Sequence, residues 1–373
     1  MKTNGKDTKL GVVPALRFPE FDNYWDIKEL SKIANLIKER ARNGNYTPMS
    51  VTSGVGLVSQ KEKFGRDISG NQYSSYFVIR KGDFAYNKSA TNLYPEGYIS
   101  MLKKLEIAAV PNSIFTCFKV NRKEVLPEYL DYLFENNYHG KWLRKFIEVG
   151  ARAHGSLSID TKKLFELPIV FPSINEQQKI ADCLSSIDAL IKATENKIDE
   201  LKAHKKGLMQ QLFPAEEKTV PILRFPEFQN AGEWKQTTIG AICTISNGKS
   251  NVQDNVQNGK YPLFDRSEII KASNKFLFDC EAIIIPGEGR FIPKYYIGKF
   301  DLHQRAYALK DFTCHALFVY HYITAFSFIL TQKAVKSTVL SLRMPILEAF
   351  PLLLPNIQEQ QKIANCLSSV DDL

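Results

Sequence analysis

The sequence predicts a mixed α+β (α/β) protein of two tandem units that are joined by a long helix. Two repeated motifs and a coiled-coil pattern support this fold class. A closing motif at 167–190, LPIVFPSINEQQKIADCLSSIDAL, recurs at 350–373 as FPLLLPNIQEQQKIANCLSSVDDL, with 15 of 24 aligned positions identical. An opening motif, PALRFPEF at 14–21, recurs at 221–228 as PILRFPEF. Because each half begins and ends with the same motifs, the chain contains two copies of one structural frame.

Composition limits the class of protein. The 373 residues suffice for two domains, each with a core of its own. With 49 Lys and Arg against 40 Asp and Glu, the net charge is +9, which favours a polyanionic partner such as nucleic acid. The six cysteines form no C-x-x-C pair, which indicates reduced thiols rather than disulfides or a zinc site. No signal sequence or membrane-spanning apolar stretch occurs, so we expect a soluble cytoplasmic protein without membrane contact.

The segments between the opening and closing motifs show no likeness to each other. Short β-like runs at 76–79 and 282–285 are followed by turn residues. Helical patterns come later, at 127–136 and 315–330. Each half is therefore expected to run from strands through a helix and an irregular basic stretch to the closing motif. A repeated frame with dissimilar filling indicates one scaffold with two different surfaces.

The first closing motif predicts the start of a long helix. Ser173 and Glu176 have the spacing of a capping box, and Asn356 and Glu359 repeat it. No proline interrupts 176–212, which as a helix would be a rod of roughly 50 Å. Apolar residues alternate there at intervals of three and four, typical of a coiled-coil seam. The seam residues are Ile180, Leu184, Ile187, Ile191, Ile198, Leu201, Leu208 and Leu212.

The natural cover for this seam is the equivalent helix of the second half. Its Ile363, Leu367 and Val370 are in register with the first three seam residues. The sequence stops at Leu373, however, whereas the first copy continues for more than twenty residues. Either the second helix is truncated, which is our expectation, or another polypeptide covers the exposed seam.

Two glycine-containing segments resemble nucleotide-binding loops. The segment 243–250 ends in Gly-Lys-Ser but begins with cysteine where a phosphate-binding loop needs its first glycine. The segment 286–290, Pro-Gly-Glu-Gly-Arg, lacks the third glycine of a dinucleotide loop. We expect a polar loop at the first and a tight turn that presents Arg290 at the second.

No catalytic or metal centre is expected. Glu227, Glu233 and Lys235 resemble a metal-dependent nuclease signature, which gathers acidic residues and a lysine around a cation. Aligned on the tryptophans, however, the first copy has Tyr24 and Asp26 in place of Glu233 and Lys235. No Pro-Pro dipeptide of an amino-methyltransferase loop occurs, and the six histidines lack zinc-ligand spacing.

Clusters of Lys, Arg, Asn and Gln in loop-like contexts remain. These side chains contact guanine and adenine edges or hold phosphates, and the sequence does not separate the two roles. The candidate DNA contacts are Ser53, Lys61, Arg66, Asn87, Lys88, Ser89, Arg152, His154, Lys249, Asn251, Arg266, Arg290, Lys294, His303, Gln304 and Arg305.

This order of segments resembles the specificity subunit of a type I restriction-modification enzyme. The doubled EQQKIA run carries the resemblance, and further segments agree: PMSVTSG at 48–54, KGDFAYNKS at 81–89 and SLRMP at 341–345. The resemblance covers almost the whole chain. It implies two target recognition domains that each read half of a bipartite DNA site, and conserved helices that pair antiparallel as a spacer. The implied bounds are 1–165 and 215–349 for the recognition domains, and 166–214 and 350–373 for the conserved regions.

The resemblance also implies the partners. They are double-stranded DNA, two methyltransferase (modification) subunits and, through the complex, restriction or translocase subunits in a bacterial or archaeal cell. S-adenosylmethionine, ATP and Mg²⁺ would bind those subunits, so this chain would hold no cofactor and catalyse nothing alone. Self-association through the exposed helix is a further option. Two rival functions stay open: a stand-alone nuclease with two DNA-binding modules, and an interaction scaffold that does not bind DNA.

Overall fold

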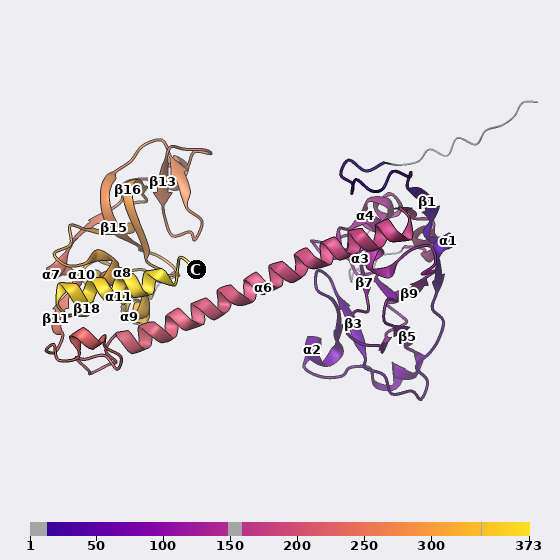
Figure 1. Cartoon of the computed structure of the whole chain (residues 1–373), viewed down its shortest axis with the longest axis horizontal. Helices are drawn as coiled ribbons and strands as arrows, with labels where there is room; N and C mark the ends of the chain where they lie inside the picture. The colour runs from indigo at the N-terminus through magenta and orange to yellow at the C-terminus, as the bar shows by residue number, and fades with distance from the viewer. Residues whose placement is uncertain (1–12, 148–158, 337) are drawn as a thin grey trace, which may run out of the picture. The chain divides into compact units, whose positions relative to one another are not determined.

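The computed structural model describes residues 13–147, 159–336 and 338–373. It divides into two compact units, Met1–Ile191 and Lys192–Leu373, and the boundary falls within the long helix α6 (Ile174–Leu212). Figure 1 draws the first unit in indigo to magenta and most of the second in orange to yellow. Both units combine strands and helices, which confirms the predicted fold class of two tandem α+β units.

The first unit is built on a four-stranded antiparallel sheet. Its strand order is β2 (Ala34–Leu36), β9 (Phe115–Val120), β6 (Phe84–Asn87), β7 (Tyr98–Met101). Two ladders of two strands adjoin it: β3 (Met49–Thr52) with β4 (Gly56–Ser59), and β5 (Phe77–Arg80) with β8 (Ile107–Val110). Helix α3 (Pro127–Glu135) follows the last sheet strand and packs Phe134 against the rings of Phe84 and Phe118.

The second unit has a six-stranded sheet. Its strand order is β12 (Thr244–Asn247), β17 (Ala306–Lys310), β15 (Phe278–Pro286), β16 (Lys294–Leu302), β13 (Tyr261–Phe264), β14 (Lys271–Ser273). All pairs are antiparallel except β13 with β16. Helix α8 (Ala316–Ala325) follows β17 as α3 follows β9, and then α9 (Ser327–Lys333) begins. The helix expected at 315–330 is therefore two helices.

The middle segments share a topology that their sequences do not reveal. In sequence order, the strands β2, β6, β7 and β9 correspond to β12, β15, β16 and β17, and both sets are arranged in the same spatial order. The two middle segments thus differ in residue identity, while their backbones follow the same order of strands and helix, as expected for both halves. A sheet requires only apolar residues at inward positions, so the same strand order persists when individual residues differ.

In each unit, a short ladder joins the segment that follows the opening motif to the closing motif. Strand β1 (Asp26–Glu29) pairs with β10 (Pro168–Phe171), and β11 (Lys235–Thr238) pairs with β18 (Pro351–Leu354). One helical turn follows each first strand, and its leading amide donates to the closing motif, from Leu30 to the Leu167 carbonyl and from Ile239 to that of Phe350. The remaining short helices are α1 (Leu30–Ile33), α2 (Gln60–Phe64), α4 (Tyr138–Leu143), α5 (Thr161–Phe165), α7 (Ile239–Ile242) and α10 (Met344–Glu348).

A buried ion pair holds the opening motif on the closing motif in both units, and we call it the Arg–Glu clasp. In the first unit, Arg17 donates from Nε and Nη2 to the two carboxylate oxygens of Glu176, both at 2.7 Å. In the second, Arg224 donates in the same way to Glu359, both at 2.8 Å. The carboxylates are 1% and 0% exposed. A two-point Arg–carboxylate bond is geometrically demanding, which explains why both motifs recur almost unchanged.

The next residue of the closing motif fastens the helix that covers the sheet. Gln177 accepts from the Leu126 amide at 2.8 Å and donates to the Pro172 carbonyl at 2.8 Å. Gln360 likewise accepts from the His315 amide at 3.0 Å and donates to Pro355 at 2.8 Å. Leu126 and His315 are the residues that precede α3 and α8. The Glu-Gln pair therefore connects the ladder, the long helix and the covering helix.

The predicted capping boxes are only half formed. Ser173 and Asn356 accept from the amides of Glu176 and Glu359, at 3.5 Å and 2.9 Å. The glutamate side chains do not complete the box, because both oxygens of each bind the clasp arginine. A distant partner therefore overrides the local capping pattern.

The long helix is confirmed, but its seam is not one continuous contact. Leu208 and Leu212 pack on the core of the second unit, Leu201 is half-buried, and Ile180 packs on the core of the first. Four seam residues between them are 36% to 52% exposed: Leu184, Ile187, Ile191 and Ile198.

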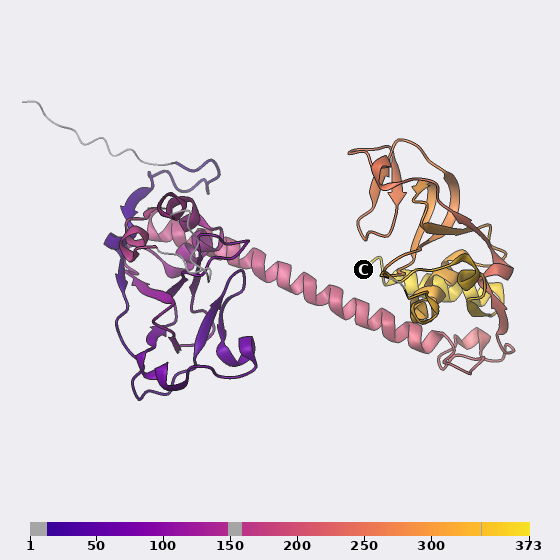
Figure 2. The same cartoon turned by 180° about the vertical axis from the view of Figure 1, so that it is seen from behind.

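The second helix, α11 (Ile357–Ser369), begins as predicted and packs on the core of its own unit. Ile363 and Leu367 are buried in that core, and Val370 is half-buried. Lys205 of α6 contacts Asp371 at 2.5 Å, and the two helices run in opposite directions there (Figures 1 and 2). The antiparallel direction agrees with the expected spacer.

Replacing Gln360 with alanine tests the role of this glutamine. The change leaves the part-buried His315 amide and the buried Pro355 carbonyl without their partner, so the second unit should lose about 1–3 kcal/mol of unfolding free energy. Urea denaturation measures the loss. Gln361→Ala is the matched control, because it makes the same change at the exposed next position of the helix and should cost nothing. Equal losses in both variants would contradict this role.

Candidate nucleic-acid interface

Loops of the second unit bring together residues that lie far apart in the sequence. They follow β13 and β15 and connect β16 to β17. Between them lies a cavity of about 260 Å³ with a polar lining. Four candidate DNA contacts line this cavity together with two carboxylates, and the set is Asp265, Arg266, Glu288, His303, Gln304 and Arg305.

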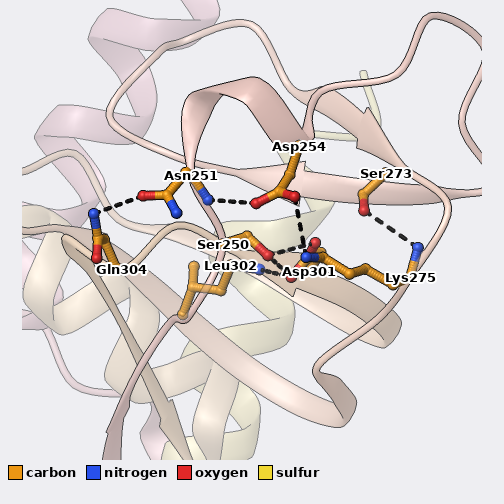
Figure 3. Close-up of polar contacts among 8 residues, drawn as sticks. All are labelled: Ser250, Asn251, Asp254, Ser273, Lys275, Asp301, Leu302 and Gln304. Atoms are coloured by element: carbon orange, nitrogen blue, oxygen red, sulfur yellow. Dashed lines mark hydrogen bonds and ion pairs between the residues drawn. The ribbon is translucent and has the colours of Figure 1, made fainter.

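Side-chain hydrogen bonds connect the loop after β12 to the β16–β17 connection beside this cavity (Figure 3). Gln304 donates from Nε2 to Oδ1 of Asn251 at 2.7 Å, and the Asn251 amide donates to Asp254 at 2.7 Å. Ser250 donates its hydroxyl to Asp301, whose side-chain oxygens lie 2.7 and 2.8 Å away and which is only 1% exposed. The candidate contacts Asn251 and Gln304 are therefore held side by side before any ligand arrives.

The Gly-Lys-Ser segment of this loop serves packing. A Cβ on Gly248 would lie 2.2 Å from the carbonyl oxygens of Leu302 and His303. The amide of Lys249 donates to the Leu302 carbonyl at 3.0 Å, while its residue stays exposed. Because the backbone amides and the serine hydroxyl already have partners, the segment is the polar loop expected and forms no phosphate cradle.

The Pro-Gly-Glu-Gly-Arg turn presents a carboxylate that sequence analysis missed. Glu288 accepts from Nη1 of Arg305 at 2.5 Å, and Nη1 of Arg266 lies 3.6 Å from its other oxygen. Arg290, which we expected the turn to present, is exposed and pairs with Glu268 at 2.8 Å. These three candidate cations are therefore neutralised by carboxylates. The two glycines that flank Glu288 were the available signal, since they mark a backbone held in close contact.

Two other candidates of the second unit are partly buried. Lys294 donates to the Ser267 carbonyl at 2.5 Å, and burial lowers the pKa of its ammonium group. His303 accepts at Nδ1 from the Arg305 amide at 3.2 Å, and burial likewise lowers the pKa of its imidazole. Both side chains are tied into the fold around the cavity.

The candidates of the first unit fall into two groups. Lys61 on α2 and Arg66 after it are exposed. Asn87 at the end of β6 is 8% exposed and accepts from the Ser89 amide at 2.9 Å, with Lys88 half-buried between them. Ser53 lies in the β3–β4 turn. A Cβ on the adjoining Gly54 would meet the Tyr94 hydroxyl at 3.3 Å, so this turn touches the β6–β7 connection. Arg152 and His154 lie outside the described residues.

A carboxylate on the β6–β7 connection binds Arg144, an arginine that the sequence analysis missed. Glu96 is 1% exposed and accepts from Nε of Arg144 at 2.5 Å, while the arginine side chain is 71% exposed. The two residues are 48 positions apart, so no local sequence pattern predicts that they pair. The connection corresponds to that between β15 and β16, which carries Glu288.

The nuclease signature is dispersed. Glu227 pairs with Lys362 beside the clasp, as Glu20 pairs with Lys179 in the first unit, and Glu233 and Lys235 are exposed. Among the described residues, no three His, Cys, Asp or Glu side chains gather as metal ligands would.

In that same part of the chain, no helix has the length and apolar character needed to cross a membrane.

Comparisons with known proteins agree with this architecture. The family described as "Type I restriction modification DNA specificity domain" matches residues 23–203 and 231–373. The type I restriction enzyme EcoDI specificity subunit of Escherichia coli is 30% identical over 140 residues, 37% of this chain and 31% of that protein. The putative MjaX specificity subunit of Methanocaldococcus jannaschii is 26% identical over 220 residues, 56% of this chain and 48% of that protein. The chain thus spans less than half the length of these two relatives.

A solved structure shows the same fold. The type I restriction-modification system S subunit from M. genitalium superposes with a TM-score of 0.62 over 97% of this chain and 92% of that chain, at 16% identity. The two family matches include both closing motifs and both clasp glutamates, Glu176 and Glu359. This chain belongs to the family of type I restriction modification DNA specificity domains.

Proposed function

We propose that this chain is the sequence-specific DNA-binding subunit of a type I restriction-modification complex, with no catalytic activity of its own. Each unit would read one half of an asymmetric bipartite target. The observation that carries this proposal is the repeated clasped frame with different polar loops on each copy. The repeated frame holds both recognition surfaces in the same way, and the different loops give them different base preferences.

The loops around the cavity of the second unit are the proposed reading surface. Arginine pairs with guanine edges or phosphates, and asparagine and glutamine pair with adenine edges. Arg266, Arg305, Asn251 and Gln304 supply these side chains from separate loops. In the first unit, the corresponding proposal covers Ser53, the exposed cations near α2, and the β6–β7 connection with Arg144.

We take 1–165 and 215–349 as the recognition domains, and 166–214 and 350–373 as the conserved regions. The long α6 would set the distance between half-sites and, through its exposed seam, dock two methyltransferase subunits. Those subunits and the restriction or translocase subunits would supply S-adenosylmethionine-dependent methylation and Mg²⁺- and ATP-dependent cleavage. Self-association through the same seam is the alternative use of this face. The complex would act on DNA in the cytoplasm of a bacterial or archaeal cell.

The rival functions predict different behaviour. A stand-alone nuclease would cut DNA with Mg²⁺ and lose that activity on Glu233→Ala. The pairing of Glu227 with Lys362 and the exposure of Glu233 do not favour it. A scaffold that does not bind DNA would show only weak DNA affinity with a flat salt response.

The proposed function predicts that the affinity for DNA depends steeply on salt concentration. Because phosphate contacts release counterions, the affinity of the purified chain for duplex DNA should fall about a hundredfold or more between about 50 and 200 mM salt. Arg266→Gln should flatten the slope of log affinity against log salt by roughly one. Lys299→Gln, which changes an exposed lysine outside the cavity, is the control. Fluorescence anisotropy measures both slopes, and a flat response of the unmodified chain would exclude the proposed function.

The proposed role of α6 predicts that the length of this helix sets the spacer between the half-sites. Deleting residues 194–197 shortens α6 by about 6 Å and keeps the seam in approximate phase. The motif enriched from a randomised duplex library should then keep both half-sites and lose about two base pairs of spacer, since a base pair rises about 3.4 Å. Replacing the same four residues with alanine retains the helix length and should leave the spacer unchanged. An altered half-site with an unchanged spacer would contradict the proposal that the length of α6 sets the spacer.

A further inference from the structure

Glu288 holds the two arginines that line the cavity of the second unit. Its Oε1 accepts from Arg305 at 2.5 Å, and its Oε2 lies 3.6 Å from Nη1 of Arg266. Without this carboxylate, two guanidinium groups would face each other across the cavity with no charge between them. Glu288 therefore neutralises the part of the reading surface where cations converge.

The backbone fixes Glu288 in this place. The Gly287 amide donates to the Arg305 carbonyl at 2.8 Å, and the Gly289 amide donates to the Leu340 carbonyl at 3.0 Å. A Cβ on Gly287 would lie 2.5 Å from the Arg305 carbonyl oxygen, and Gly289 has a φ of +81°. Only glycine fits both positions without strain. The carboxylate is thus built into the turn and does not depend on a ligand for its position.

Exposure shows which groups meet a ligand. The side chain of Glu288 is 20% exposed, whereas those of Arg266 and Arg305 are 64% and 63% exposed. DNA would therefore reach the arginines first, with the carboxylate behind them. A phosphate at this position must compete with Glu288 for the same N–H groups and is repelled by its charge.

We propose that Glu288 determines specificity by lowering the affinity of the second unit for non-cognate DNA. The inference rests on the proposed function, because it assumes that this surface reads DNA. Non-cognate binding depends on phosphate contacts alone, so competition from Glu288 for the arginine N–H groups weakens it directly. A cognate site adds contacts from base edges, which offset that competition.

In the first unit, too, a carboxylate lies behind an exposed arginine, although the residues come from different sequence positions. Glu96, on the connection equivalent to that of Glu288, holds Arg144 with its carboxylate 1% exposed and the arginine 71% exposed. The two middle segments share no sequence pattern at these positions. A protected carboxylate behind an exposed arginine therefore arises in both units on the same sheet connection.

The test compares the unmodified chain with Glu288→Gln, which keeps the size of the side chain and removes its charge. The probes are a short duplex with the motif that the unmodified chain enriches from a randomised library, and a shuffled duplex of equal composition. Glu288→Gln should bind the shuffled duplex about five- to tenfold more tightly and steepen its salt slope by roughly one. The enriched motif should stay the same, and the ratio of cognate to shuffled affinity should fall.

Two further variants test whether the tighter binding of the shuffled duplex comes from the released arginine or from the loss of any surface carboxylate. Glu281→Gln makes the same change on β15 outside the cavity and should leave the ratio unchanged. Glu288→Gln combined with Arg305→Gln should return the shuffled-duplex affinity toward that of the unmodified chain, because the released cation is gone. Urea denaturation establishes that each variant is folded.

The outcomes are distinct. If the unmodified chain enriches no motif from the library, the proposed function fails and this inference fails with it. If the unmodified chain is selective and Glu288→Gln leaves the shuffled-duplex affinity unchanged, the inference alone is wrong. A change of the enriched motif at one base pair would also overturn it, since Glu288 would then contact a base.

Discussion

The Arg–Glu clasp is the interaction on which the rest of each unit depends. It joins the first and last segments of a unit, 159 residues apart in the first copy and 135 in the second, and both carboxylates are excluded from water. Removing one arginine would leave the buried carboxylate of its partner without a counter-charge, which destabilises the fold. With the ends of a unit fixed to the start of its helix, the strands and loops between them are free to differ. This division explains how one frame supports two dissimilar surfaces.

The sequence predicted the features that depend on repetition and periodicity, and missed those that depend on distant contacts. The two units and the helix 174–212 follow from repeats and an unbroken apolar period. An apolar spacing of three and four suits a domain core as well as a coiled coil, and Ile363 and Leu367 are buried in the core of their own unit. The capping boxes form only by half, since the glutamate side chains bind remote arginines. Glu288 was missed because its partners come from other loops. Among the candidate contacts, the sequence identified residues of the right chemistry but not their charge balance.

Charge balance changes how the candidate surface works. The net charge of +9 suggests a basic face, yet Arg266, Arg290 and Arg305 each have a carboxylate partner. Asn251 and Gln304 are likewise already hydrogen-bonded to each other. A surface whose polar groups are satisfied in advance is rigid, and a ligand binds it only by offering better partners. Such preorganisation favours discrimination between DNA sequences over tight binding to any DNA.

The central claim is that one chain carries two dissimilar readers on one repeated frame. Its most direct test is methylome sequencing of cells that express this chain with its cognate methyltransferase subunit. The account predicts methylated adenine within an asymmetric motif of two different half-sites separated by a fixed spacer. A palindromic motif would contradict it, because two copies of the chain would then each use a single recognition domain. Absence of any methylated motif would contradict the assignment of site selection to this chain.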